Sequence, residues 1–125
     1  MEQTVSGKPV QRADLSSLGW LVQAVSGLLL VVLLLLHMIA NHFVAAGGLQ
    51  SFQDVVRYLS NPLILVLETA FLVTVTSHAL LGVRAVLFDL NLSAGAKRAV
   101  TALLTVLGVA MVGYGVWLTS IILRS

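Results

Sequence analysis

Residues 62–87 read PLILVLETAFLVTVTSHALLGVRAVL, an apolar run that contains only three ionisable side chains, Glu68, His78 and Arg84. A helix rises about 1.5 Å per residue, so about 20 residues cross a hydrocarbon core of about 30 Å. Pro62 suits the first turn of such a helix, where its missing N–H leaves no bond unmade. We therefore predict a membrane-spanning helix over residues 62–87.

Two further apolar runs, residues 18–41 and residues 99–123, are also long enough to span. The whole chain is 58% hydrophobic and 10% charged, whereas soluble domains are about 25% charged. Asp14, Ser16 and Ser17 precede the first run, and the two serines are candidate N-caps. We predict an all-α membrane protein with three transmembrane helices in a single domain, residues 1–125. The polar first 17 residues and the long run after them predict no cleaved signal.

Basic residues are distributed unevenly between the two ends of these runs. Under the positive-inside rule the side richer in Lys and Arg faces the cytoplasm. This predicts an inside N-terminus and an outside C-terminus for a multi-pass protein of the cell membrane. The inner side would carry Lys8, Arg12, Arg84, Lys97 and Arg98, and the outer side Arg57 and Arg124.

The loop between the first two runs, which then lies outside, contains a helical pattern. Apolar residues recur there at i, i+3, i+4 and i+7, and polar residues fill the opposite side. We predict a short amphipathic helix on the outer surface; the alternative is a helical connector with no further role. The apolar side is Phe52, Val55, Val56 and Leu59, and the opposite side is Gln53, Asp54, Arg57 and Tyr58.

Several classes of function are excluded by residues that the sequence lacks. There is no cysteine, so disulfides, Cys-ligated zinc, iron–sulfur clusters on this chain and c-type haem attachment are excluded. No catalytic serine motif or phosphate-binding glycine loop is found, and we predict no catalytic residue. The net charge of +2 is too small to indicate a nucleic-acid partner.

His78 is the strongest candidate for a functional residue, because an ionisable side chain inside a membrane span is costly. Positions +4 and +11 return to nearly the same face of a helix, which places Gly82 and Asp89 on the stripe of His78. We predict that His78 is an axial haem ligand, that the flat ring lies against Gly82, and that Arg84 meets acidic groups near the surface. The alternative is a structural histidine bonded to a neighbouring helix.

His37, near the outer end of the first run, is a second candidate ligand. Its expected depth differs from that of His78 by about 10 Å in a core of about 30 Å. Two imidazoles on one metal ion lie only about 4 Å apart, since each metal–nitrogen bond is about 2 Å. Straight spans therefore cannot bring both to one iron, so each needs a histidine from another chain, or one of them is not a ligand. We expect His42 at the headgroup interface.

Other polar and small residues lie within the runs. Glu68 would relay protons, accept a hydrogen bond or simply pack as a neutral carboxyl. Gln23, Ser26 and Gly27 form a polar patch near the inner end of the first run, where Ser26 shares the face of His37; the patch either touches a quinone headgroup or only packs. Small residues in the third run predict close packing, within the chain or against a partner: Gly108, Ala110, Gly113 and Gly115.

The arrangement His78-x-x-x-Gly82-x-Arg84-x-x-x-x-Asp89 resembles a motif of one membrane-protein family. The family is the membrane-anchor cytochrome b subunits of succinate:quinone oxidoreductase, which comprises respiratory complex II and the quinol:fumarate reductases. Trp20 to Gly27 is similar to the family motif that ends in Arg-x-Ser/Thr-Gly. His37, followed by Asn41 and His42, looks like the prokaryotic anchors built from two subunits. The resemblance covers about residues 18–90.

This resemblance implies a subunit without dehydrogenase chemistry of its own. A flavoprotein subunit and an iron–sulfur subunit would oxidise succinate at the inner face of a prokaryotic cell membrane. This chain and a second membrane-anchor subunit would hold haem b between them, surrounded by membrane lipid, and pass electrons to quinone. Two-haem members go with menaquinone, which is the quinone we expect if His37 binds iron.

The resemblance also assigns residues to roles. His78 would bind the haem nearer the inside and His37 a second haem nearer the outside. Gly82, Arg84 and Ser26 would contact the cofactor, and the residues near the quinone would be Trp20, Gln23 and Asp89. The chain departs from the family at Ala24, where the motif has arginine, and at Leu90, where some members have tyrosine. We therefore expect the partner anchor to supply main quinone contacts.

Two alternative functions remain open from the sequence. The chain would be a haem-free structural anchor if its histidines only pack. It would be a small proton-coupled transporter if Glu68 carried protons, although transporter sites favour interrupted helices and none is expected here.

Overall fold

The computed structural model describes residues 15–45 and 47–125, and this part of the chain is helical without strands. The long helix α1 (Leu15–Ile39) continues into the π-helical turn η1 (Ala40–Val44). The short helix α2 (Phe52–Leu59) precedes the long helices α3 (Pro62–Phe88) and α4 (Ala94–Ile122). Three segments are long and apolar enough to cross a membrane, which confirms the predicted fold class: Ser17–Val44, Pro62–Phe88 and Ala94–Ile122.

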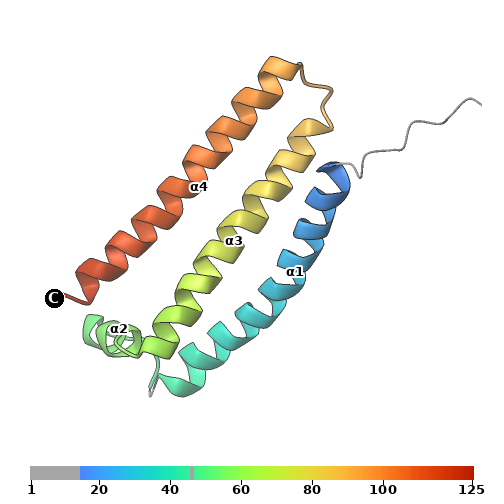
Figure 1. Cartoon of the computed structure of the whole chain (residues 1–125). Helices are drawn as coiled ribbons and strands as arrows, with labels where there is room; N and C mark the ends of the chain where they lie inside the picture. Colours follow the sequence, from blue (N-terminus) through green and yellow to red (C-terminus); the bar gives the residue numbers. More distant parts are fainter. Residues whose placement is uncertain (1–14, 46) are drawn as a thin grey trace, which may run out of the picture.

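The three long helices lie side by side in a row, with α3 between α1 and α4 (Figure 1). Because successive spans run in opposite directions, the end of α1, the start of α3 and the C-terminus share one end of the molecule. Helix α2 lies across that same end (Figure 1). The other end holds the start of α1 and the connection between α3 and α4. That this second end faces the cytoplasm stays a prediction from the charge bias.

Two helix starts differ from the expectation. Helix α1 begins at Leu15, so Ser16 and Ser17 lie inside the helix and the predicted serine caps are wrong; Asp14 lies outside the described residues. Helix α4 begins at Ala94, five residues before the predicted start, because Ser93 Oγ accepts a hydrogen bond from Ala96 N at 3.2 Å. A serine cap stabilises polar first turns that a search for apolar residues leaves out.

Helix α2 matches the predicted residues 52–59, and it is fixed at its start by a capping box. The hydroxyl of Ser51 accepts from Asp54 N at 3.2 Å, and the Asp54 carboxylate accepts from Ser51 N at 2.9 Å. These two capping bonds satisfy N–H groups that have no partner within the helix. The Ser51 hydroxyl also donates to Asp54 Oδ2 at 2.7 Å, and this bond first and the bond from Ser51 N second lower the pKa of the Asp54 carboxyl.

The orientation of α2 corrects one expectation. Tyr58, expected on the polar side, is buried with only 8% of its surface exposed, whereas Phe52 of the predicted apolar side is exposed. Tyr58 packs with Ala40 and Ile64 in a small core where η1, α2 and α3 meet. A tyrosine combines an apolar ring with a polar hydroxyl, so its place depends on the partner that this hydroxyl finds.

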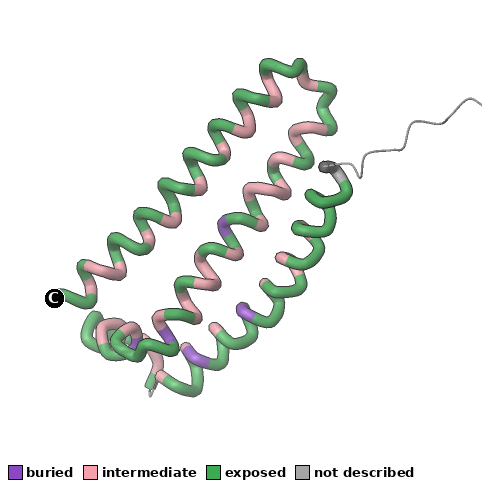
Figure 2. Tube along the Cα trace, in the orientation of Figure 1, coloured by how far each residue is buried: buried purple, intermediate pink, exposed green. Residues whose placement is uncertain are grey.

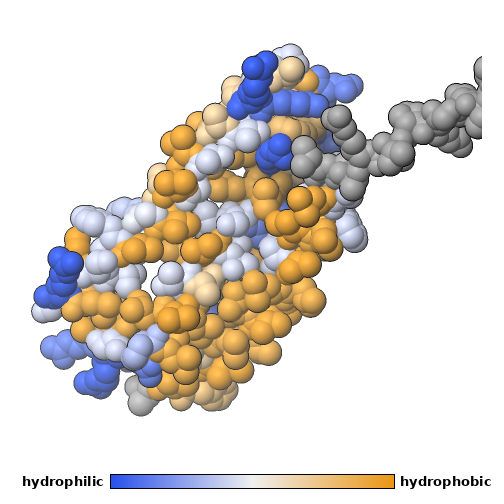
Figure 3. Space-filling model, in the orientation of Figure 1, coloured by the Kyte–Doolittle hydropathy of each residue, from blue (hydrophilic) through white to orange (hydrophobic). Residues whose placement is uncertain are grey.

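Most side chains of the described part remain exposed within the single chain. Figure 2 shows exposed and half-buried residues along all three long helices, and α4 has no buried residue. Figure 3 shows hydrophobic side chains across the middle of the visible face and hydrophilic ones at its two ends. A soluble protein does not expose apolar area on this scale, so lipid or other subunits must cover these faces. The buried residues are Leu33, Ala40, Tyr58, Ile64 and Thr76.

Two of the four small residues in the third span pack within the chain. A Cβ added to Gly108 would lie 2.8 Å from Leu80 Cδ1, and one added to Gly115 would lie 2.5 Å from Leu72 Cδ2. A Cβ on Gly113 would meet nothing within 4 Å. Gly108 and Gly115 therefore allow the close approach of α4 to α3, as expected for small residues in membrane helices.

We predict that Gly115→Val destabilises the purified complex, because the added branched side chain must displace Leu72. Overpacking of this kind costs about 1–3 kcal/mol. Thermal denaturation of the detergent-solubilised complex measures the effect. Gly95→Val is the matched control, since it adds the same side chain to the same helix in open space; equal losses at both positions would contradict the packing role of Gly115.

Candidate functional site: two histidine clusters between α1 and α3

The first cluster joins His78 of α3 to Ser26 of α1. His78 Nδ1 lies 2.9 Å from Ser26 Oγ, and the Ser26 hydroxyl donates to the carbonyl of Gln23 at 3.1 Å. A hydroxyl has one hydrogen. With that hydrogen on the carbonyl of Gln23, the oxygen of Ser26 is free to accept from His78 Nδ1, which requires the tautomer whose imidazole proton is on Nδ1. The lone pair of the neutral ring is then on Nε2.

Two glycines allow α1 and α3 to meet closely at this cluster. A Cβ on Gly27 would lie 3.2 Å from His78 Cε1, so the imidazole reaches α1 where a side chain is absent. A Cβ on Gly82 would lie 3.2 Å from Gln23 Nε2, so the face of Gly82 is covered by Gln23 in this chain. Gln23 Nε2 also donates to the carbonyl of His78 at 3.3 Å. Within the described residues, the buried Gln23 Oε1 accepts no hydrogen bond.

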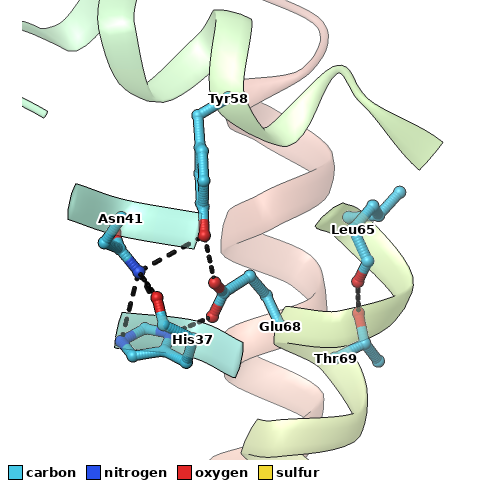
Figure 4. A network of polar contacts seen from close by, with 6 residues as sticks. All are labelled: His37, Asn41, Tyr58, Leu65, Glu68 and Thr69. Carbon is cyan, nitrogen blue, oxygen red and sulfur yellow. Dashed lines mark hydrogen bonds and ion pairs between the residues drawn. The ribbon is translucent and has the colours of Figure 1, made fainter. Parts of the chain in front are cut away.

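The second cluster lies at the other end of the spans and joins residues of α1, η1, α2 and α3 (Figure 4). His37 Nδ1 of α1 lies 2.7 Å from Glu68 Oε2 of α3. The hydroxyl of Tyr58 from α2 donates to the other oxygen of Glu68. Asn41 Nδ2 donates to the carbonyl of His37 at 2.8 Å and to Tyr58 Oη at 3.3 Å. The carboxylate of Glu68 therefore ties α2 to both neighbouring spans.

The electrostatics of the second cluster keep its donors in place. Burial raises the pKa of Tyr58, and its hydrogen bond to Glu68 adds to the effect, so Tyr58 stays a protonated donor at neutral pH. The contact between His37 and Glu68 is the one contact of ion-pair length between a basic and an acidic side chain in residues 15–45 and 47–125. The ring of Phe71 lies 4.8 Å from the His37 ring, centroid to centroid. A carboxylate on Nδ1 orients the ring so that Nε2 points away from it.

The two clusters lie far apart along the same face of α1. Ser26, which contacts His78, precedes His37 by eleven residues, or about 16 Å along a helix. Ser26 and His37 both face α3, in agreement with the prediction that they share one face of their helix. No three His, Cys, Asp or Glu side chains that could hold a metal ion gather within the described residues. Each cluster therefore offers one imidazole.

The remaining candidate residues do not contact either cluster. Arg84 faces α4, where its Nε donates to Thr101 Oγ1 at 3.1 Å and its guanidinium lies 4.2 Å from the ring centroid of Phe88. Asp89 is the C-cap of α3 and is exposed. Trp20 is 71% exposed. The roles predicted for Arg84, Asp89 and Trp20 stay predictions.

The contacts of the second cluster were not predicted from the sequence. His37 and Glu68 were expected to act separately, and Tyr58 and Asn41 were not expected to belong to a site. One signal was available: Glu68 lies six residues after the start of its span and His37 about four before the predicted end of its own, so their depths match. His42 is exposed in η1, as an interfacial residue should be.

Comparison with known proteins identifies the family. Residues 8–117 match the family described as the succinate dehydrogenase/fumarate reductase transmembrane subunit. The chain belongs to this family. It is 34% identical over 107 residues to the succinate dehydrogenase hydrophobic membrane anchor subunit of Archaeoglobus fulgidus, which covers 86% of this chain and 91% of that protein.

A second relative agrees with this assignment. The anchor subunit of the same name from Thermoplasma acidophilum is 29% identical over 114 residues, 91% of this chain and 93% of that protein. No solved structure gives a significant match. The predicted resemblance to complex II anchors is thus confirmed, and the three spans make the chain a multi-pass membrane anchor subunit.

Proposed function

We propose that this succinate dehydrogenase anchor binds haem b through His78 and passes electrons from the iron–sulfur subunit to a membrane quinone. The carrying observation is the hydrogen bond between His78 Nδ1 and Ser26. Histidines that bind metal almost always donate the other ring N–H to a nearby oxygen, which fixes the tautomer and the ring orientation. The contact of His78 Nδ1 with the Ser26 oxygen supports such an arrangement, and within the described residues its Nε2 has no hydrogen-bond partner.

The residues around His78 suit a haem site shared with a second anchor subunit. Ser26 contacts Nδ1 of His78, and Gly27 leaves space for the imidazole ring against α1. Nε2 of His78 would then be the atom that binds the iron. The second axial ligand must come from another chain, because His37 lies about 16 Å away along the helix. When bound, the haem supplies one-electron storage between the iron–sulfur clusters and the quinone.

The side chain of Gln23 lies beside the proposed haem site and has an unpaired oxygen within the described residues. Its side-chain oxygen is buried next to His78 and accepts nothing within the described residues. Buried acceptors are rarely left unpaired in native structures. We propose that a donor from outside the chain, the hydroxyl of a reduced quinone or a group of the partner anchor, completes this contact. Trp20 and Asp89 remain candidates for the wider quinone site.

The experiment that tests the proposal is a reduced-minus-oxidised optical spectrum of the purified complex. We expect a b-type haem band. A complex that reduces quinone with no such band would overturn haem binding and establish the haem-free structural anchor instead. No contact favours the transporter alternative, since α3 is continuous and Glu68 is held by His37 and Tyr58.

We predict that Ser26→Ala weakens haem binding without abolishing it. Loss of a partner that orients a metal-binding histidine typically costs about 10–100-fold in metal affinity. Haem content per complex, measured during stepwise detergent washing, reports the change. Ser120→Ala is the control, because Ser120 also lies in a span but donates only to the Val116 carbonyl; equal haem loss in both variants would argue against the orienting role of Ser26.

We propose that His37 binds a second haem nearer the outside, with Glu68 as the partner that orients its ring. His37→Ala is then expected to remove one of two haems and to leave the His78 haem in place. A pyridine haemochrome assay, which counts haem per complex, measures this. An unchanged count would restrict the chain to one haem and would remove the reason for preferring menaquinone.

A further inference from the structure

A groove between α3 and α4 has no part in the proposed electron transfer. Its volume is about 820 Å³, within the range of about 300–1,000 Å³ that is usual for small-molecule sites. The residues at its wall are mostly apolar or small, and it lies on the α4 side of α3, away from the contact between His78 and Ser26. The α4 residues lining it run from Thr101 to Gly113, about 18 Å along the helix axis.

The groove leads from the middle of the membrane to one polar end. Arg84 and Thr101 lie at that end and are joined by a hydrogen bond of 3.1 Å. Lys97 Nζ lies 5.4 Å from the same Phe88 ring over which the Arg84 guanidinium lies. Two cations therefore lie near one aromatic ring, and one of them, Arg84, lines the groove.

These cations are not neutralised by the part of the chain that the structure describes. The contact of ion-pair length found there joins His37 and Glu68 at the opposite end, and neither Arg84 nor Lys97 has a carboxylate within pairing distance. A buried or interfacial arginine presents a fork of N–H donors that matches a phosphate group. The mouth of the groove thus has the charge that a phosphate would complement.

We propose that the groove binds an anionic phospholipid, with one acyl chain between α3 and α4 and its phosphate at Arg84 and Lys97. The apolar length of the groove matches a chain that reaches from the headgroup region to the middle of a bilayer whose core is about 30 Å. The expected inner side of the membrane also carries the anionic lipids that basic residues attract.

Native mass spectrometry of the delipidated complex, with dioleoyl phosphatidylglycerol and dioleoyl phosphatidylcholine added back, tests the proposal. We expect one tightly held phosphatidylglycerol per anchor and weaker binding of phosphatidylcholine. The double variant Arg84→Gln, Lys97→Gln is expected to lose this preference, with a drop of roughly thirtyfold in phosphatidylglycerol affinity. Arg57→Gln, at the other end of the molecule, should leave the affinity for both lipids unchanged.

Substitutions at two valines of α4 distinguish an effect of filling the groove from a general effect of a larger side chain. Val109 lines the groove and Val106 does not, although both lie on α4 and are 70% and 67% exposed. Val109→Phe is expected to weaken the binding of both lipids, whereas the Val106→Phe complex should bind them as tightly as the unsubstituted complex does. The subunit masses in the same spectra show whether each variant complex has assembled.

Four outcomes would overturn the proposal. They are equal binding of the two lipids by the parent, equal effects of the two phenylalanine variants, loss of a subunit from the assembled Val109→Phe complex, and a quinone mass in place of lipid. Loss of the haem band on replacing Arg84 would instead assign that guanidinium to a haem propionate. The haem band is measured in a separate experiment, so a result that overturns the lipid site does not bear on the proposed haem site.

Discussion

Replacing His78 with alanine is expected to remove the haem that we propose beside Ser26. No other imidazole of the described residues lies near Ser26, because His37 is about 16 Å away along α1. The reduced-minus-oxidised spectrum of the purified complex should therefore lose that haem's band, and electron transfer from succinate to quinone should fall with it.

Two controls make this result specific to the ligand. His42→Ala removes an exposed histidine from η1 and should leave the spectrum unchanged. Succinate oxidation with a soluble artificial acceptor should survive in His78→Ala, since we expect the dehydrogenase chemistry on other subunits. A variant complex that is assembled and keeps its full haem band would show that His78 is a structural histidine, bonded to Ser26 only for packing.

Replacing Glu68 with leucine is expected to release α2 from the spans. The change removes the partner of both the Tyr58 hydroxyl and His37 Nδ1, and leaving the buried Tyr58 hydroxyl unpaired costs about 1–3 kcal/mol. Amide hydrogen exchange of residues 52–59 in the intact complex should accelerate at least about fivefold, the change that about 1 kcal/mol produces.

The neighbouring residue Thr69 supplies the control for this prediction. Thr69 is exposed and donates only to the Leu65 carbonyl, one turn earlier on α3 (Figure 4). Thr69→Leu should therefore leave exchange in α2 unchanged, and Glu68→Gln should fall between the two because its amide oxygen still accepts from Tyr58. Unaltered exchange in Glu68→Leu would mean that the apolar contacts of Tyr58 alone hold α2 in place.

Local sequence patterns were enough to predict the spans and the helix before α3. Length and hydropathy located the apolar runs, since the bilayer sets the number of residues that a spanning helix needs. The polar ends were less predictable: the capping serine before α4 is Ser93, and the helix therefore begins in a segment that hydropathy excludes. The side of α2 that would be buried was also missed, because Tyr58 depends on Glu68 for its partner.

The sequence by itself determined that this protein crosses a membrane three times and that His78 begins the motif of a complex II anchor, because bilayer thickness and helix period act on neighbouring residues. Only the tertiary structure decided what the histidines contact. Ser26 and His78 are 52 residues apart, and His37 and Glu68 are 31 apart. These pairs form because α1 and α3 pack with particular rotations and heights, and packing in lipid depends on the shapes of both helices together.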